Sequence, residues 1–131
     1  RTSRRQRQMC IRDSIMIPLI YQGNTKHKSK SLAIQCLEEV NLIEHLNSPV
    51  SILSGGEAQR VGIARAMAMK SKIILADEPT GNLDSTNSQT VMRNLVEICE
   101  SHMITLIVVS HDNDVINTMR NKKTMIDGKI I

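Results

Sequence analysis

The amino-acid sequence predicts an α/β fold in which a parallel sheet is flanked by helices. Two short apolar runs, residues 73–76 and 104–109, have the length and the aliphatic composition of buried strands. Segments with a helical apolar period alternate with these runs, an order that is typical of a parallel sheet. Because the runs are almost wholly apolar, we expect both faces of the strands to be covered.

The remaining elements follow from periodicity and turn residues. Four segments carry apolar residues at helical spacing and are expected to be helices: residues 31–40, 56–70, 91–99 and 112–119. Residues 15–21 form an apolar segment that Pro18 interrupts, and Gly23 follows as a turn signal. A second turn is expected at Asp127-Gly128, between two short apolar stretches.

The composition predicts a folded chain with an aliphatic core. Of the 131 residues, 40% are hydrophobic and 23% are charged, a balance that excludes disorder and low complexity. The apolar runs are far shorter than the roughly 20 residues that a membrane-spanning helix needs. Tyr21 is the only aromatic residue, which excludes a stacked-aromatic site for single-stranded nucleic acid.

The formal net charge of +4 comes from one end of the chain. Residues 1–14 hold five arginines and one acidic residue, whereas residues 15–131 hold twelve basic and twelve acidic residues. Since the larger part is neutral, it lacks the electrostatic footprint of a DNA or RNA binder, and we expect no nucleic-acid partner.

The basic segment also has an unusual sequence. Residues 4–14, RRQRQMCIRDS, resemble the translation of a sequencing-library adapter. We therefore expect residues 1–14 to be a tail of non-native origin. We further expect the gene to continue upstream of Ile15, so that the chain is truncated at its N-terminus.

Both predicted strands end in residues that can carry chemistry. Asp77 and Glu78 follow the first strand, and His111 follows the second. The carboxyl ends of parallel strands meet at one edge of a sheet, where ligands bind. Two carboxylates and an imidazole there can supply a Mg²⁺ ligand, a general base and a phosphate contact, which favours phosphoryl transfer. The alternative is that the two acids cap the strand and do nothing more.

A second candidate site precedes the helix at residues 56–70. Ser54, Gly55 and Gly56 place a hydroxyl and two flexible residues directly before that helix. Free backbone N–H groups and the helix dipole bind anions at such a position. Taken alone, this pattern is more often a capping turn than an anion-binding site.

Together with these residues, four motifs resemble those of the ATP-binding subunit of ABC transporters. LSGGEAQR (53–60) is similar to the family signature, and IILADEP (73–79) to the Walker B strand with its glutamate. Asn82-Leu83-Asp84 is similar to the D-loop, and Ser110-His111-Asp112 to the switch histidine. The resemblance extends over residues 15–131. It implies the C-terminal part of a RecA-like P-loop NTPase domain, with a helical subdomain at 15–71 and the ATPase core at 72–131.

The resemblance also implies ATP and Mg²⁺ as cofactors and a role for each motif residue. Asp77 would hold Mg²⁺, Glu78 would activate the attacking water, and His111 would contact the γ-phosphate. The signature residues would bind a nucleotide held by the opposite subunit, and a D-loop residue would link the two sites: Ser54, Gly55, Gly56, Glu57 and Asp84.

Two motifs of the family are missing from the sequence: the P-loop, and the Q-loop, for whose glutamine Gln22 is not a plausible substitute. No spacing among the six glycines fits the P-loop pattern G-x-x-x-x-G-K-[ST]. We therefore expect the chain by itself to bind ATP poorly and to hydrolyse it negligibly.

The expected partners are a second ATP-binding subunit and a transmembrane permease subunit, at the cytoplasmic face of the inner membrane. The motifs favour the branch that serves lipoprotein release and the export of macrolides and antimicrobial peptides. Two alternatives stay open: a non-transport ATPase that couples ATP binding to a cell-division complex, and a chromosome or DNA-repair ATPase, which the neutral charge disfavours.

Overall fold

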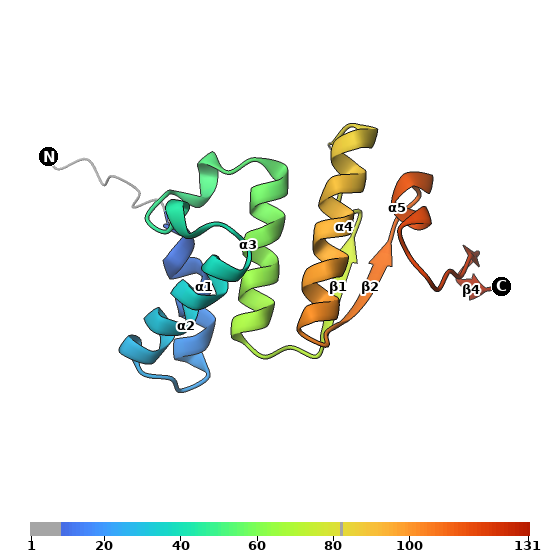
Figure 1. Cartoon of the computed structure of the whole chain (residues 1–131). Helices are drawn as coiled ribbons and strands as arrows, with labels where there is room; N and C mark the ends of the chain where they lie inside the picture. The colour runs from blue at the N-terminus through green and yellow to red at the C-terminus, as the bar shows by residue number, and fades with distance from the viewer. Residues whose placement is uncertain (1–8, 82) are drawn as a thin grey trace, which may run out of the picture.

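The computed structural model describes residues 9–81 and 83–131 (Figure 1). Its helices are α1 (Ile11–Tyr21), α2 (Lys26–Glu39), α3 (Gly55–Ala68), α4 (Ser85–Ser101) and α5 (Asn113–Asn117). Its strands are β1 (Ile73–Asp77), β2 (Thr105–Val109), β3 (Met125–Ile126) and β4 (Lys129–Ile130). Two short 3-10 turns, η1 (Ile43–His45) and η2 (Val50–Ile52), connect α2 to α3.

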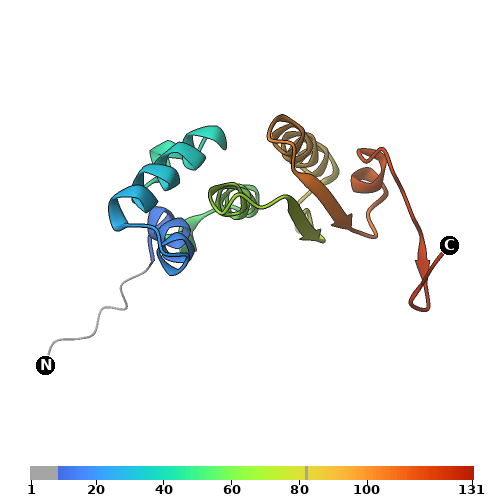
Figure 2. The ribbon, with the colours of Figure 1, turned by 90° about the horizontal axis from the view of Figure 1, so that it is seen from below.

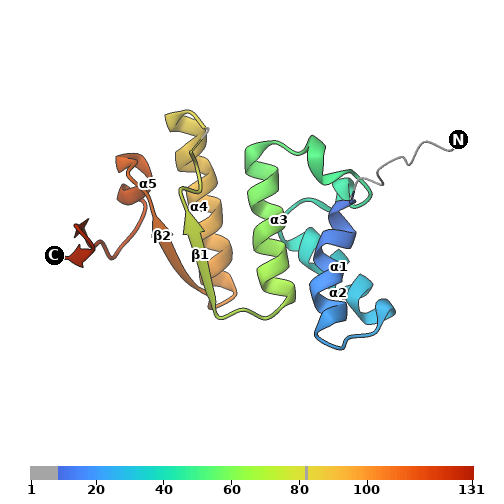
Figure 3. The same cartoon turned by 180° about the vertical axis from the view of Figure 1, so that it is seen from behind.

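The strands β1 and β2 form the predicted parallel sheet. They pair in register from Ile73 opposite Thr105 to Asp77 opposite Val109, and α4 makes the crossover between them. Figures 1 and 3 show α4 on one face of the sheet and no helix over the other face. The α/β class with a parallel sheet is thus confirmed.

The two strands are covered on one face, whereas the sequence predicted that both faces would be covered. Exposed and half-buried residues alternate along β1 and β2, and Leu75 on the open face is 76% exposed. On the other face, Ile74, Leu106 and Val108 pack against the core. The apolar runs indicate that the residues are suited to burial, but they do not indicate which neighbouring elements pack on each face of the sheet.

The helix α1 differs from the broken segment that Pro18 predicted. It begins at Ile11 and continues through Pro18 to Tyr21. It therefore includes the last four residues of the segment predicted to be non-native, and Ile11 is fully buried. The non-native origin of residues 1–14 and the division into two subdomains at residue 71 stay predictions.

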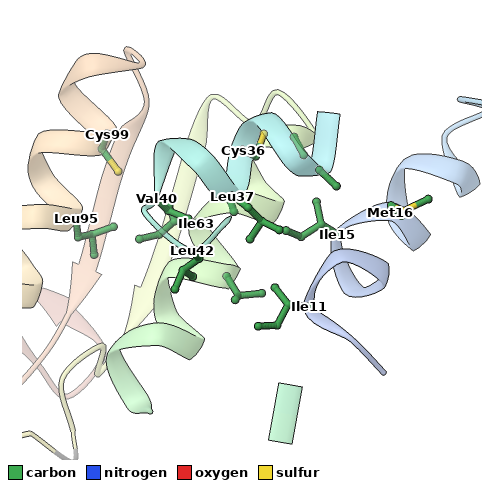
Figure 4. Packing of buried hydrophobic residues seen from close by; sticks show 14 of the residues in the cluster. Ile11, Ile15, Met16, Cys36, Leu37, Val40, Leu42, Ile63, Leu95 and Cys99 are labelled. Carbon is green, nitrogen blue, oxygen red and sulfur yellow. The ribbon is translucent and has the colours of Figure 1, made fainter. Parts of the chain in front are cut away.

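The core lies mainly between α1, α2 and α3, and continues toward α4. Figure 4 shows Ile15 of α1 and Leu37 of α2 pointing toward each other, and Ile63 of α3 next to Val40. Further buried residues, Leu95 and others on α4, belong to the same cluster. Figure 2 shows α3 along its axis, with α1 and α2 on one side and the α4–sheet unit on the other. The helix α3 thus connects the helical part of the chain to the sheet.

The C-terminal hairpin confirms the second predicted turn. The strands β3 and β4 are antiparallel, with Met125 opposite Ile130. Asp127 and Gly128 between them have positive φ values of 48° and 76°, as a tight two-residue hairpin turn requires. Among the described residues, none of the helices has both the length and the apolar character that crossing a bilayer demands.

Candidate functional site

The carboxyl ends of β1 and β2 bring the predicted catalytic residues together. Because the strands are parallel and in register, the residues that follow them share one edge of the sheet. The backbone N–H of Glu78 donates to the carbonyl of Val109 over 2.8 Å, which continues the pairing of the strands by one residue. Glu78 has a φ of 45°, a left-handed conformation that costs a non-glycine residue about 1–3 kcal/mol and that persists where the surroundings fix it.

The carboxylate of Glu78 accepts three hydrogen bonds from the end of β2. His111 Nδ1 lies 2.7 Å from Glu78 Oε1, and the backbone N–H of His111 donates to the same oxygen over 3.2 Å. Ser110 Oγ donates to Oε2 over 3.2 Å. A carboxylate has about four acceptor positions, so one position remains for a further donor such as water.

The ion pair sets the charge of both partners. The hydrogen bond from His111 is the largest cause that lowers the pKa of Glu78 below its ordinary value of 4.5. The same hydrogen bond, with Coulombic attraction, raises the pKa of His111 above its ordinary value of 6.5. Near neutral pH the site therefore favours an ionised carboxylate beside an imidazole whose protonated form is stabilised.

The strand ends border an open pocket of about 420 Å³. Its wall includes Glu78, His111 and Asp112, together with the loop that leads toward α4. Thr80 of that loop is buried, and the backbone N–H of Gly81 donates to the carbonyl of Glu78 over 3.2 Å. The pocket thus has a fixed wall and carries the ion pair at its rim.

Asp77 fits a magnesium site in part. It is exposed at the end of β1, and carboxylate oxygens are the ligands that Mg²⁺ prefers. Within residues 9–81 and 83–131, no three His, Cys, Asp or Glu side chains cluster as a metal site. Mg²⁺ usually takes one or two carboxylates and completes its shell with water and substrate phosphates, so one carboxylate is compatible with Mg²⁺ that arrives with a nucleotide.

The signature segment forms a capping box at the start of α3. The backbone N–H of Glu57 donates to Ser54 Oγ over 3.3 Å, and the backbone N–H of Ser54 donates to Glu57 Oε2 over 3.0 Å. The hydrogen bond from the Ser54 backbone is the main cause that lowers the pKa of Glu57. His45 lies 3.8 Å from the same carboxylate. Ser54 and Glu57 therefore have a structural role whatever else they bind.

The two glycines of this segment are not required by the packing that the structure describes. A Cβ on Gly55 would lie 4.0 Å from Leu83, and one on Gly56 would lie 3.6 Å from Val91. Both are ordinary contact distances, and neither glycine has a positive φ. A side-chain-free backbone at the N-terminus of a helix is suited to close approach by a phosphate.

Asp84, in the segment that resembles a D-loop, caps the next helix. Asp84 Oδ1 accepts from the backbone N–H of Asn87 over 2.9 Å at the start of α4. Asn82 of the same motif lies outside the described residues. No described hydrogen bond or ion pair joins Ser54, Glu57 or Asp84 to the Glu78–His111 pair.

The sequence model of the ABC transporter family matches residues 1–81, more than half of the chain. The chain belongs to the ABC transporter family. It is 40% identical over 119 residues to the lipoprotein-releasing system ATP-binding protein LolD of Leptospira interrogans, covering 91% of this chain and 50% of that protein. It is 38% identical over 120 residues to the macrolide export ATP-binding/permease protein MacB of Rhodopirellula baltica, covering 90% and 18%.

Solved ABC cassettes share the fold. A cassette named cbiO1 from Clostridium perfringens superimposes with a TM-score of 0.85 at 25% identity, covering 95% of this chain and 50% of that one. The dimeric bacterial cassette MJ0796 gives a TM-score of 0.63 at 36% identity, covering 82% and 48%. The chain spans about half the length of LolD and of these two cassettes, and 18% of MacB.

Two residues of this ABC chain have roles in the site that the motif pattern did not reveal. Ser110 was part of a motif, but its hydrogen bond to Glu78 follows from the sheet register. Gln59 Nε2 donates to the carbonyl of Pro79 over 3.1 Å and so ties α3 to the loop after β1. The only available signal was that Gln59 lies on the same helical face as residues facing the sheet, which periodicity alone does not resolve.

Proposed function

We propose that the protein is the ATP-hydrolysing subunit of an ABC transporter that powers export or release of a peptide, a lipoprotein or a small drug-like substrate through a membrane partner. The observation that carries this proposal is the Glu78 carboxylate, which residues of the neighbouring strand hold ionised beside an open pocket. The similarity to LolD and MacB supports the choice of a transporter over a cell-division complex or a DNA-repair ATPase.

In this proposal, Glu78 acts as the general base. Its free acceptor position binds a water molecule, and the carboxylate takes a proton from that water as it attacks a phosphate. His111 keeps Glu78 ionised and presents a positive charge where negative charge collects on the phosphate oxygens. Mg²⁺ held by Asp77 would supply further charge neutralisation for the bound ATP.

Two copies of the cassette are needed for one complete site in this proposal. Ser54, Gly55, Gly56 and Glu57 of one subunit contact a nucleotide that the second subunit holds, and Asp84 links the two sites. Two observations support this arrangement: the signature segment makes no described contact with the Glu78–His111 pair within one chain, and the related cassette MJ0796 is a dimer. A transmembrane permease at the cytoplasmic face of the inner membrane would be the other partner.

The test is the steady-state Mg-ATPase activity of the full-length protein with its membrane partner. Glu78→Gln removes the base and keeps the shape, so we expect turnover to fall by roughly 10²–10⁴-fold with ATP binding retained. Glu100→Gln is the matched control, because Glu100 pairs with Arg120 on the exposed end of α4, far from the chemistry. Unchanged turnover in Glu78→Gln would exclude Glu78 as the base.

The 131-residue chain by itself is a second, separate test. Because its sequence contains no P-loop pattern, we expect weak ATP binding and negligible hydrolysis from the purified chain. Isothermal titration calorimetry and phosphate release measure the two properties. Robust Mg-ATPase activity from the chain alone would show that residues outside the P-loop pattern can hold the nucleotide.

A further inference from the structure

The helix α1 contains a proline, Pro18, at a position where proline removes one backbone hydrogen bond of the helix. Pro18 lies beyond the first turn of α1, where the missing backbone N–H removes the donor to the carbonyl four residues earlier. That carbonyl belongs to Ser14, which is only 6% exposed. The Ser14 hydroxyl donates to the carbonyl of Ile11 and cannot serve its own carbonyl. A buried carbonyl without a donor is destabilising.

A side chain from another helix supplies the missing donor. Arg65 Nε of α3 lies 3.3 Å from the Ser14 carbonyl oxygen and donates to it. Arg65 is half-buried, and hydrogen bonds from a charged donor are stronger than those between neutral groups. The acceptor is a main-chain atom, so the bond does not depend on which side chain residue 14 carries.

We propose that Arg65 is a positioning residue: by replacing the donor that Pro18 withholds from α1, it fixes the helix that begins with the signature segment. Ser54 caps α3, and Arg65 lies about three turns further along the same helix. A rigid helix that is anchored at Arg65 carries its N-terminus with it. The consequence for nucleotide contact rests on the proposed function, whereas the bond and its effect on α3 can be tested without nucleotide.

A double-mutant cycle on the 131-residue chain tests the pairing. Arg65→Ala should lower the folding equilibrium constant roughly tenfold, since it leaves a buried carbonyl unsatisfied. Pro18→Ala restores an N–H that can bond the Ser14 carbonyl within α1, so adding Arg65→Ala to it should cost less than about threefold. Urea unfolding measures both. Arg93→Ala, on the exposed face of α4, is the control and should have the same small effect in both backgrounds.

The position of the signature segment needs a readout of its own. In ¹H–¹⁵N spectra, Arg65→Ala should shift the amide resonances of Gly55 and Gly56, and the Pro18→Ala/Arg65→Ala double variant should keep that shift, because the restored N–H satisfies α1 and does not anchor α3. Arg93→Ala should leave them in place. The proposal would be overturned if the stability effects of Pro18→Ala and Arg65→Ala were additive. It would also be overturned if Arg65→Ala left the Gly55 and Gly56 resonances unchanged.

One measurement covers the case in which Arg65→Ala does not fold. In the unsubstituted chain, the Nε–H of Arg65 should exchange with solvent at least about tenfold more slowly than that of Arg93, because it is hydrogen-bonded to a buried acceptor. Equal exchange rates would overturn the proposal. None of these readouts requires ATP, so a failure here is distinct from a failure of the proposed ATPase function.

Discussion

Glu78, the proposed general base, shows how much of a side chain's orientation comes from its neighbours. Its backbone has a positive φ of 45°, and its carboxylate is held by Ser110 and His111 of the adjacent strand end. The left-handed backbone turns the chain away from β1 immediately after the strand, and the three hydrogen bonds fix where the carboxylate points. The orientation of the proposed base therefore depends on β2 as much as on β1.

Replacing Glu78 should change the titration of His111. Because the Glu78 carboxylate is the main cause that raises the pKa of His111, Glu78→Gln should lower that pKa toward 6.5. An NMR titration of the His111 ring resonances measures the shift. Asp77→Asn removes the neighbouring carboxylate, which is not among the causes of the shift, and should leave the His111 pKa nearly unchanged. A pKa that is insensitive to Glu78→Gln would mean that the pair does not form in solution.

The same pair gives the stability of the chain a definite pH dependence. The raised pKa of His111 means that its contribution is fully present below the ordinary pKa of 6.5 and is lost as pH rises through the folded-state pKa. The lowered pKa of Glu78 means that the contribution of Glu78 to stability is lost as the pH falls through its folded-state pKa. His111→Gln should therefore reduce the urea midpoint more at pH 5.5 than at pH 9. An equal loss at both pH values would contradict the ion pair. Since both side chains are solvent-exposed, the effect should be small.

At the scale of elements, the sequence predicts which segments are helical better than where the helices begin. The helix α3 begins one residue before the predicted segment, whereas α2 and α4 begin five and six residues before theirs. Ser54 and Asp84 both cap the helices that follow them, because Ser and Asp side chains satisfy free N–H groups whatever the tertiary context. The path of α1 through Pro18 could not be predicted in this way. The hydrogen-bond donor that Pro18 lacks is replaced by Arg65, which follows Pro18 by 47 residues. No local sequence pattern contains that information.

The capping box at α3 should be measurable by stability alone. Ser54→Ala removes the acceptor of the Glu57 N–H and should lower the free energy of unfolding by about 1 kcal/mol. Ser54→Thr keeps a hydroxyl at the cap and should lose much less. Urea unfolding of the two variants separates the cap from any role in nucleotide contact, since no nucleotide is present. Equal losses would show that the hydroxyl does not cap α3.

At the scale of the whole molecule, the sheet formed by β1 and β2 is covered by a helix on one face only. The face of the sheet opposite α4 carries Ile73, Leu75, Ile107 and Val109, all of them exposed. Figure 3 shows no helix over this face of β1 and β2. The sequence predicted buried strands because the residues of β1 and β2 are mostly apolar. What the sequence could not tell is that the described part of the chain contains no element that packs on this face.

An exposed apolar sheet face of this kind should make the isolated chain associate with itself. We expect the apparent mass in light scattering coupled to gel filtration to rise with concentration. Leu75→Glu places a charge at the centre of the face and should weaken association roughly tenfold or more, because burying one leucine contributes about 1.5–3 kcal/mol and a tenfold change in affinity is about 1.4 kcal/mol. Met103→Glu is the matched control: Met103 is 91% exposed and follows α4 outside the sheet. A chain that stays monomeric at every concentration, or equal effects of the two substitutions, would show that this face does not drive association.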